Sequence, residues 1–214
     1  MNMILLPTKK ERPEVVVLAD GDYPSGAVAA SLLANAGRVV CCDGATAAYV
    51  ERGGTPAAIV GDCDSLSGEL RARYSDILHP IAEQDSNDLS KAVRFCAGHG
   101  MRDITILGAT GKREDHTLGN VSLLADYLEE GLTVRMVTDY GVFDPIRDDA
   151  VFESFPGQQV SIFSFEPSAP VSGENLVYIL PPGLRAWWQG TLNESLSDRF
   201  TVRTKTPAVV FRVF

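Results

Sequence analysis

The sequence predicts an α/β domain followed by an all-β domain. Up to about Thr138, short apolar runs typical of buried strands alternate with segments of helical periodicity, which favours a mostly parallel, doubly wound sheet. After Asp139 the helical periodicity disappears, and strand-like segments follow one another between turn signals, as in a small β-sandwich. We therefore expect an α/β domain over residues 1–143 and a β-sandwich domain over residues 144–214.

Each element of the first domain has its own local signal. The run Val15–Leu18 is continuously apolar, as expected of a strand covered on both faces. Glycines end most of the helices, and capping residues precede the later ones, Ser65 or Ser67 in one case and Ser86 or Asn87 in the other. Strands are predicted at residues 14–19, 39–42, 57–60, 76–79, 104–107 and 132–138. Helices are predicted at residues 25–36, 46–51, 66–74, 85–97 and 114–130.

The second domain is predicted from four strand-like segments without helical periodicity. They lie at residues 159–165, 175–180, 199–204 and 208–214. Turn signals such as Pro156-Gly157 and Pro181-Pro182-Gly183 separate them. Short strands joined by such turns are typical of antiparallel pairing, so we expect an antiparallel unit here.

Composition and charge exclude several classes of partner. The chain has 214 residues, 22% of them charged, and a net charge of −9, which argues against a nucleic-acid backbone or an anionic membrane surface. We expect no membrane span and no signal peptide, because no apolar run has the required length. The cysteines make no C-x-x-C pair, so we expect neither zinc nor disulfides and place the protein in the cytoplasm.

Acidic side chains follow several of the predicted strands. Asp62 and Asp64, in Gly61-Asp62-Cys63-Asp64-Ser65, are two residues apart, so in extended backbone both carboxylates would point the same way. Asp43, Asp88 and Asp115 follow other strands, and ligands of open α/β sheets bind outside the carboxyl ends of the strands. Hard oxygen ligands of this kind suit Mg²⁺ on a phosphate. The alternative is that each acid only caps a helix or ends a turn.

The segment Gly108-Ala109-Thr110-Gly111-Lys112-Arg113 supplies the opposite charge. Glycines after a strand let backbone N–H groups approach a phosphate, and the following helix offers the positive end of its dipole. The spacing does not match a Walker A loop, and the chain contains no G-x-G-x-x-G. The segment therefore predicts a phosphate-binding loop, and the alternative is a glycine-rich turn with exposed basic residues.

Four sequence blocks together resemble the thiamine pyrophosphokinase family. That family carries Asp-Gly, then G-D-x-D-S, then D-x-x-D before K-A, and then G-x-x-G-x-R-x-D-H-x-x-x-N. The corresponding blocks occur here in the same order: Cys42-Asp43-Gly44-Ala45, Gly61-Asp62-Cys63-Asp64-Ser65, Asp85-Ser86-Asn87-Asp88-Leu89-Ser90-Lys91-Ala92 and the segment from Gly108 to Asn120. The resemblance covers the whole chain, including the change to a C-terminal β domain.

The resemblance implies transfer of the diphosphoryl group of ATP to the hydroxyl of thiamine, which gives thiamine diphosphate and AMP. It implies ATP as co-substrate and Mg²⁺ as cofactor, held by Asp62, Asp64 and Asp88. The residues it implies for catalysis are Asp43, Asp64, Asp88, Arg113 and Asp115. The residues it implies for the nucleotide are Ser65, Thr110, Gly111, Lys112, Arg113, His116 and Asn120.

Thiamine is an aromatic cation, and the resemblance implies a site of matching chemistry. Tyr178 falls where an aromatic residue of the family stacks on the substrate, and a ring face there would attract the thiazolium. Trp187 and Trp188 are rival aromatic residues. The substrate residues implied are Gln84, Asp85, Tyr178, Asn193 and Ser195. The family forms homodimers with the thiamine pocket between the α/β domain of one subunit and the β domain of the other.

Three departures from the family pattern bear on the acceptor. One glycine is missing after Asp43, Asn87 replaces a threonine, and Leu192-Asn193-Glu194 replaces Ser-Asn-Glu, so that Ser195 would have to supply the lost hydroxyl. Two other functions therefore stay open. One is a related pyrophosphokinase acting on a hydroxymethylpterin, and the other is a non-catalytic module that binds a magnesium nucleotide.

Overall fold

The computed structural model describes residues 3–214, which form two compact units. The α/β unit comprises Thr8–Leu123 and Leu132–Asp139. The β unit comprises Tyr140–Phe214 together with Leu124–Gly131 and the N-terminal residues through Pro7. The predicted division between residues 143 and 144 falls inside strand β8, Gly141–Ile146, whereas the change of unit precedes that strand.

The α/β unit contains six strands in the order β7-β6-β2-β3-β4-β5, and every pair of neighbours is parallel. These strands are β2 (Val15–Leu18), β3 (Arg38–Cys42), β4 (Ala58–Gly61), β5 (Leu78–Pro80), β6 (Asp103–Leu107) and β7 (Thr133–Val137). Each of the six strands predicted for this part of the chain overlaps a strand of the structure, but the one predicted at 76–79 is only Leu78–Pro80, because Ser75–Ile77 form a 3₁₀ turn. The side chains of β2 and β4 are entirely buried, which explains why their sequences are continuously apolar or small.

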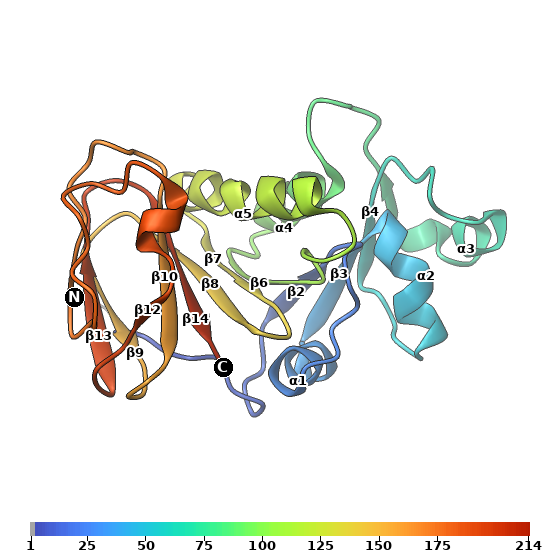
Figure 1. Cartoon of the computed structure of the whole chain (residues 1–214). Helices are drawn as coiled ribbons and strands as arrows, with labels where there is room; N and C mark the ends of the chain where they lie inside the picture. Colours follow the sequence, from blue (N-terminus) through green and yellow to red (C-terminus); the bar gives the residue numbers. More distant parts are fainter. Residues whose placement is uncertain (1–2) are drawn as a thin grey trace. The chain divides into compact units, whose positions relative to one another are not determined.

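Helices connect these strands and cover the sheet. They are α1 (Ala27–Asn35), α2 (Asp43–Glu51), α3 (Gly68–Arg73), the 3₁₀ turn η1 (Ser75–Ile77), α4 (Asp88–Gly98) and α5 (Glu114–Glu129). Figure 1 shows α1 and α4 on opposite faces of the sheet. The side chains of Ser67 and Asn87 cap α3 and α4, as the sequence predicts. None of the helices in residues 3–214 has both the length and the apolar character needed to cross a bilayer.

The strand order fixes where a ligand can bind in the α/β unit. From β2 the chain adds β3, β4 and β5 on one side, and it then returns to add β6 and β7 on the other side. The loops after β2 and β6 therefore run in opposite directions and leave a crevice outside the carboxyl ends of these two strands. The acidic segments and the glycine-rich segment predicted from the sequence all follow strands at this edge.

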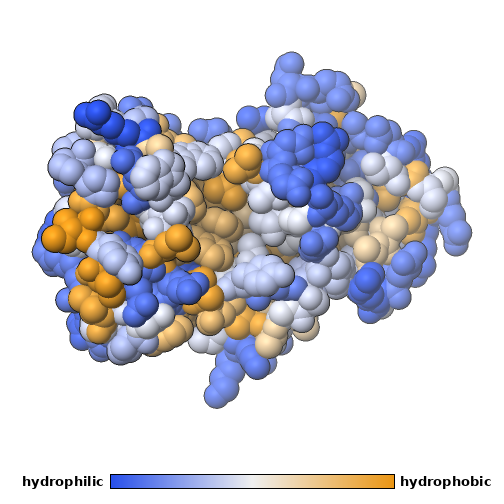
Figure 2. Space-filling view, viewed as in Figure 1, coloured by the Kyte–Doolittle hydropathy of each residue, from blue (hydrophilic) through white to orange (hydrophobic). Residues whose placement is uncertain are grey.

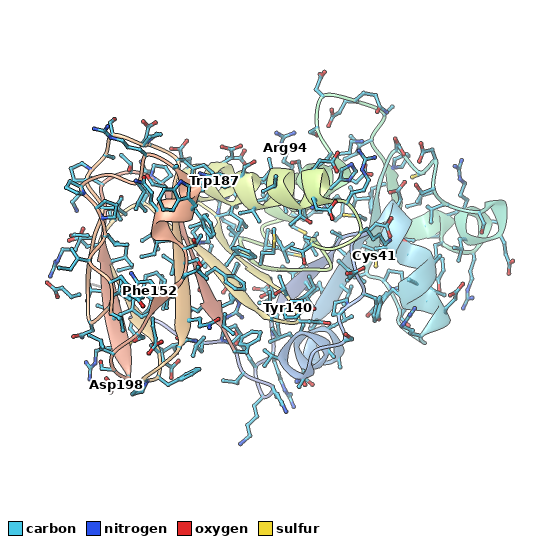
Figure 3. All side chains as sticks on the ribbon, in the orientation of Figure 1. Cys41, Arg94, Tyr140, Phe152, Trp187 and Asp198 are labelled. Carbon is cyan, nitrogen blue, oxygen red and sulfur yellow. The ribbon has the colours of Figure 1, made fainter. Side chains whose placement is uncertain are left out.

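Two sheets make up most of the β unit, with an apolar core between them. In one layer the strand order is β12-β10-β14-β8, which is one end of a ten-stranded sheet, and the other layer is the four-stranded sheet β1-β9-β13-β11. In the core the rings of Phe152 and Phe200 stack with their centroids 5.0 Å apart, and Figure 3 shows Phe152 pointing into the unit. The remaining elements are β1 (Met3–Ile4), β9 (Ala150–Glu153), β10 (Gln159–Ser164), β11 (Ser172–Glu174), η2 (Trp187–Gly190), β12 (Asn193–Glu194), β13 (Arg199–Arg203) and β14 (Ala208–Val213).

The β unit differs from the sequence prediction in several places. Strands β8, β9, β11 and β12 were not predicted. The pairing is not antiparallel throughout, because β1 runs parallel to β9. The guanidinium of Arg212 holds this N-terminal strand by donating to the carbonyl oxygens of Ile4 and Leu5, at 3.2 and 3.1 Å. The strand predicted over 175–180 is absent, because Asn175 has a left-handed φ of 62° and the following residues make only an isolated bridge at Leu176.

Candidate active site

A hollow of about 380 Å³ lies at the carboxyl edge of the parallel sheet. It is lined by the loops that follow β2, β3, β4, β5 and β6. The hollow therefore lies where the strand order predicts a crevice. The polar residues that line it are Asp20, Asp43, Asp62, Ser65, Gln84, Ser86, Asn87, Asp88, Lys91, Lys112, Arg113, His116 and Asn120.

Three carboxylates form one group at this edge. One oxygen from each of Asp43, Asp62 and Asp64 lies within 4.8 Å of the other two. The sequence suggested that extended backbone would bring Asp62 and Asp64 together, and this expectation was wrong. Cys63 between them has a left-handed φ of 67°, and this tight turn lets the backbone N–H of Asp64 donate to Asp62 Oδ1 at 3.1 Å.

Asp43 is the most deeply buried member of this group. It begins α2, its side chain is 2% exposed, and its Oδ1 accepts the N–H of Gly44 at 2.7 Å. Its Oδ2 has no hydrogen-bond partner among the described residues. Burial raises the pKa of the Asp43 carboxyl, and the nearby charge of Asp88 raises it further. Gly61 makes room for it, because a Cβ at Gly61 would lie 2.6 Å from Asp43 Cγ.

Asp62 and Asp64 are more accessible and are oriented by neighbours. Gln84 donates from Nε2 to Asp62 Oδ2 at 3.4 Å, and the Ser65 hydroxyl donates to Asp64 Oδ1 at 3.0 Å. The N–H of Asp64 and then the amide of Gln84 lower the pKa of the Asp62 carboxyl. Gln84, predicted to contact the substrate, therefore lines the hollow beside the acidic group.

Asp88 lies at the start of α4, outside the group of three carboxylates. Its Oδ1 accepts a hydrogen bond from Lys91 Nζ at 3.0 Å. The Lys91 side chain is 3% exposed. Burial lowers the pKa of the Lys91 ammonium, but the hydrogen bond and the charge of Asp88 outweigh burial and raise that pKa above its ordinary value. The structure thus pairs Asp88 with a buried cation.

The glycine-rich segment after β6 forms a tight loop against the loop after β2. Gly108, Gly111 and Lys112 all have positive φ values, of 65°, 78° and 56°. A Cβ at Gly111 would lie 2.0 Å from a carboxylate oxygen of Asp22, so only glycine fits there. Lys112 Nζ donates to Asp20 Oδ1 at 2.8 Å.

Asp20, which lines the hollow, and Asp22, which contacts the glycine-rich loop outside the hollow lining, were not predicted as site residues. The signal was available, because Asp20-Gly21-Asp22 directly follows the strand Val15–Leu18, as the other acids follow theirs. Sequence alone did not reveal the order of the strands. The order places β2 beside β6, and the N–H of Asp22 donates to the carbonyl oxygen of Thr110 at 2.8 Å.

Arg113 and Asp115 form an exposed pair at the start of α5. Arg113 Nη2 and Nε donate to the two oxygens of Asp115 at 2.6 and 3.1 Å, and this contact lowers the pKa of the Asp115 carboxyl. Arg113 and His116 line the hollow. Of the predicted site residues, Asp64, Thr110 and Asp115 are not among the described residues that line it.

Asn120 links two loops of the site from a buried position in α5. Its Nδ2 donates to the carbonyl oxygen of Ala109 at 2.8 Å, and its Oδ1 accepts from Asn87 Nδ2 at 3.0 Å. Asn87 in turn caps α4 by accepting the N–H of Ser90 at 2.9 Å. The loop after β6 and the start of α4 are therefore tied together through Asn120.

The remaining predicted substrate residues lie outside this hollow. Asp85 is exposed, and its N–H donates to the side chain of Glu83 at 2.7 Å. Tyr178, Asn193 and Ser195 belong to the β unit. Asn193 is buried and bonds both the N–H and the carbonyl oxygen of Tyr178, at 3.0 and 2.8 Å, while the Tyr178 ring is 63% exposed. Ser195 is fully buried, and its hydroxyl donates to the carbonyl oxygen of Ser197.

The acidic group has the properties of a site for a divalent cation. Three carboxylates held close together repel one another unless a cation lies between them. The unpartnered Oδ2 of buried Asp43 is the kind of oxygen that a metal ion would satisfy. All the donors are carboxylates, and such hard oxygen ligands suit Mg²⁺. The residues present therefore fit that ion.

Two family models match the chain in succession. The model described as thiamin pyrophosphokinase, catalytic domain, matches residues 29–136. The model described as thiamin pyrophosphokinase, substrate-binding domain, matches residues 141–211. The first match contains the three carboxylates and the glycine-rich loop, and the second contains Tyr178 and Asn193.

Curated relatives match over shorter segments. The chain is 32% identical to the thiamine pyrophosphokinase of Bacillus subtilis over 99 residues, which are 44% of this chain and 46% of that protein. It is 37% identical to thiamine pyrophosphokinase 1 of Oryza sativa subsp. japonica over 94 residues, which are 39% of this chain and 35% of that protein. The aligned segment thus spans less than half the length of these relatives.

Solved structures match over nearly the whole chain. A thiamin pyrophosphokinase family protein from Enterococcus faecalis superposes with a TM-score of 0.78 at 20% identity, covering 94% of this chain and 99% of that one. Yeast thiamin pyrophosphokinase superposes with a TM-score of 0.80 at 16% identity, covering 100% of this chain and 91% of that one. At such identities the likeness establishes the shared fold.

Proposed function

Because the chain belongs to the thiamine pyrophosphokinase family, we propose that it transfers the diphosphoryl group of ATP to the hydroxyl of thiamine. The products are thiamine diphosphate and AMP. The observation that carries the proposal is the hollow at the switch of strand order, which is lined both by Asp43 and Asp62 of the three-carboxylate group and by the glycine-rich loop. Four free cysteines suit a reducing compartment, and we propose the cytoplasm.

In this proposal Asp43, Asp62 and Asp64 hold Mg²⁺ against the phosphates. The bound ion would neutralise phosphate charge and orient the tail for attack at the β-phosphorus. Asp43 supplies the buried oxygen that has no partner, and Gln84 and Ser65 fix the orientation of the other two carboxylates. Asp88, which the resemblance implies as a further ligand, lies outside this group, and its Oδ1 is paired with Lys91.

The glycine-rich loop and the start of α5 bind the rest of the triphosphate in this proposal. Backbone N–H groups at a helix N-terminus attract anions. Lys112 and Arg113 bring mobile positive charge, and each has an exposed carboxylate partner, Asp20 or Asp115, that a phosphate can replace. Asn120 keeps the loop in position through Ala109, so its contribution is to support the loop.

Tyr178 is the residue that we propose for contact with the thiazolium ring. Its ring is exposed, and Asn193 holds its backbone on both sides, so the side chain is presented from a fixed position. Trp187 packs edge-on against Phe163 and Phe165, as the label in Figure 3 helps to locate, whereas Trp188 is 74% exposed. A cation over an exposed aromatic face gains electrostatic energy.

The acceptor assay tests this function directly. The protein is incubated with ATP, Mg²⁺ and either thiamine or a hydroxymethylpterin, and AMP and the diphosphorylated acceptor are quantified. We expect AMP and thiamine diphosphate in equal amounts with thiamine, and neither product with the pterin. If the diphosphorylated acceptor forms only with the pterin, the acceptor is the pterin and not thiamine. AMP without a diphosphorylated acceptor would mean hydrolysis and would contradict the proposal.

We also propose that two copies of the chain associate through an exposed apolar patch on the β unit. The patch consists of Val177, Tyr178, Ile179, Trp188, Leu192 and Leu196. Its segments are adjacent, because the N–H of Val177 donates to the carbonyl oxygen of Glu194 at 2.9 Å and Leu176 bridges to Ser195. Apolar side chains reach the surface of this unit in orange at the left of Figure 2. Contiguous exposed apolar surface of this kind marks an interface.

Charge introduced into this patch should separate the two copies. Ile179, which is 96% exposed, and Leu192, which is 81% exposed, are replaced together by glutamate. We expect the wild-type protein to have the mass of a dimer by light scattering after gel filtration, and the double variant to have the mass of a monomer. Lys205→Glu, on an exposed turn of the same unit, should remain dimeric. A monomeric wild-type protein would refute the association.

A further inference from the structure

A buried cation lies in the acidic hollow and is not used by the mechanism proposed above. Lys91 is in the first turn of α4, and its side chain is 3% exposed although it lines the hollow. Its ammonium can donate three hydrogen bonds. Among the described residues, Asp88 is the partner of that ammonium, at 3.0 Å from Nζ. Donor capacity therefore remains beside the space where a ligand would lie.

The other cations of the hollow differ from Lys91. Lys112 and Arg113 are 53% and 69% exposed, so water weakens the attraction of each for an anion. An ammonium shielded from water interacts more strongly with a nearby negative charge. Keeping such a charge buried is costly unless it is fully paired. The hydrogen bond to Asp88 uses one of the three donors of the Lys91 ammonium. An oxyanion bound in the hollow would accept from the donors that remain.

We propose that Lys91 binds phosphate oxygens of the nucleotide tail directly, and that Asp88 holds its ammonium in place for this contact. This inference rests on the proposed function, because it assigns a residue to the same site. The ammonium would supply positive charge on the α4 side of the tail, while the acidic group supplies the metal side. Such a point charge is a common way to bind phosphate. Asp88 is then a positioning residue for Lys91.

A simpler role for Lys91 is to neutralise Asp88, and the two roles predict different binding. The probe is α,β-methylene-ATP with Mg²⁺, in which a methylene group replaces the oxygen between the α- and β-phosphorus atoms, so that diphosphoryl transfer cannot occur. AMP, which lacks the β- and γ-phosphates, is the comparison ligand. Affinities are measured by calorimetry. We expect Lys91→Met to weaken binding of α,β-methylene-ATP by roughly 10- to 100-fold and to leave AMP binding within about twofold.

A double-mutant cycle separates contact with the tail from pairing with Asp88. In an Asp88→Asn background the partner charge is absent, so Lys91→Met should still weaken the binding of α,β-methylene-ATP by about tenfold. No further loss in that background would overturn the proposal. The double variant contains no unpaired buried charge, so it remains available for measurement where Lys91→Met alone fails to fold.

Arg94→Met provides the matched control. Arg94 lies one turn further along α4, is exposed, and projects from the helix as labelled in Figure 3. It should bind both nucleotides as the wild-type protein does. An equal loss of α,β-methylene-ATP binding in Arg94→Met would mean that long-range charge rather than contact is responsible, and would overturn the proposal.

Turnover by the wild-type protein tests the proposed function separately from the inference about Lys91. Absence of thiamine diphosphate with ATP, Mg²⁺ and thiamine would contradict the proposed function. A selective loss of α,β-methylene-ATP binding in Lys91→Met would still establish Lys91 as a phosphate contact in that case. Full turnover with unchanged α,β-methylene-ATP binding in the variant would overturn only the inference about Lys91.

Discussion

Replacing Asp43 with asparagine is expected to lower diphosphoryl transfer by roughly 10³-fold. The substitution keeps the shape of the side chain and its acceptor for Gly44, but it removes the charge on the oxygen that we propose as a metal ligand. The rate of AMP formation at saturating ATP and thiamine measures the loss. Asp64→Asn should have a similar effect on turnover, because Asp64 belongs to the same group of oxygens.

The stability of the metal-free protein should change in the opposite direction. The pKa of the Asp43 carboxyl is raised in the fold, so its charged form destabilises the fold at neutral pH, and stability returns only as the pH falls through the raised pKa. Asp43→Asn should therefore raise the melting temperature measured in a chelator at pH 7. Asp64→Asn, at an exposed position, should not raise the melting temperature in this way. Asp76→Asn, at an exposed position outside the hollow, should change neither the turnover rate nor the melting temperature.

A lower melting temperature together with normal turnover would contradict the role of Asp43 on both counts. It would mean that the carboxylate contributes to folding and is not needed for chemistry. The melting temperature of the same variant can also be measured with and without added Mg²⁺. The wild-type protein should gain thermal stability from Mg²⁺ through binding to the folded state, and Asp43→Asn should gain less.

The second large effect is expected at Arg212 in the β unit. Its guanidinium has no exposed surface and donates to Asp144 Oδ2 at 2.7 Å and to the carbonyl oxygen of Glu153 at 2.7 Å. Arg212→Met leaves the charge of Asp144 buried and leaves carbonyl oxygens at β1 and β9 without this donor. Removing one partner of a buried ion pair costs about 3–5 kcal/mol. Urea unfolding followed by tryptophan fluorescence measures the loss.

Exposure decides how large the effect of a lost ion pair is. Arg203, whose side chain is 41% exposed, pairs with Asp149 and Glu174, and Arg203→Met should cost less than about 1 kcal/mol. In the variant Arg212→Met/Asp144→Leu both charges are absent, so we expect much of the lost stability to return. Equal effects of Arg212→Met and Arg203→Met would show that burial of the first pair does not matter.

The sequence predicted the α/β part well, because there the local pattern and the tertiary environment agree. Strands buried on both faces must be apolar along their whole length, so Val15–Leu18 and its counterparts were found from the sequence. The acids after these strands were then recognised as candidate site residues, because parallel strands end at one edge of the sheet. In the β unit the pattern is weaker, and the left-handed φ of Asn175 prevented the strand expected after it.

By itself the sequence determined the succession of strands and helices, the acidic and glycine-rich segments at the strand ends, and the resemblance to one family. Those features are local, because each depends on residues that are neighbours along the chain. Only the tertiary structure decided the burial of Asp43, the pairing of Asp88 with Lys91, and the parallel addition of β1 to β9. The burial of Asp43 and the pairing of β1 with β9 depend on groups far apart in the sequence. Asp88 and Lys91 are one helical turn apart, but only packing decided that the Lys91 side chain loses water there.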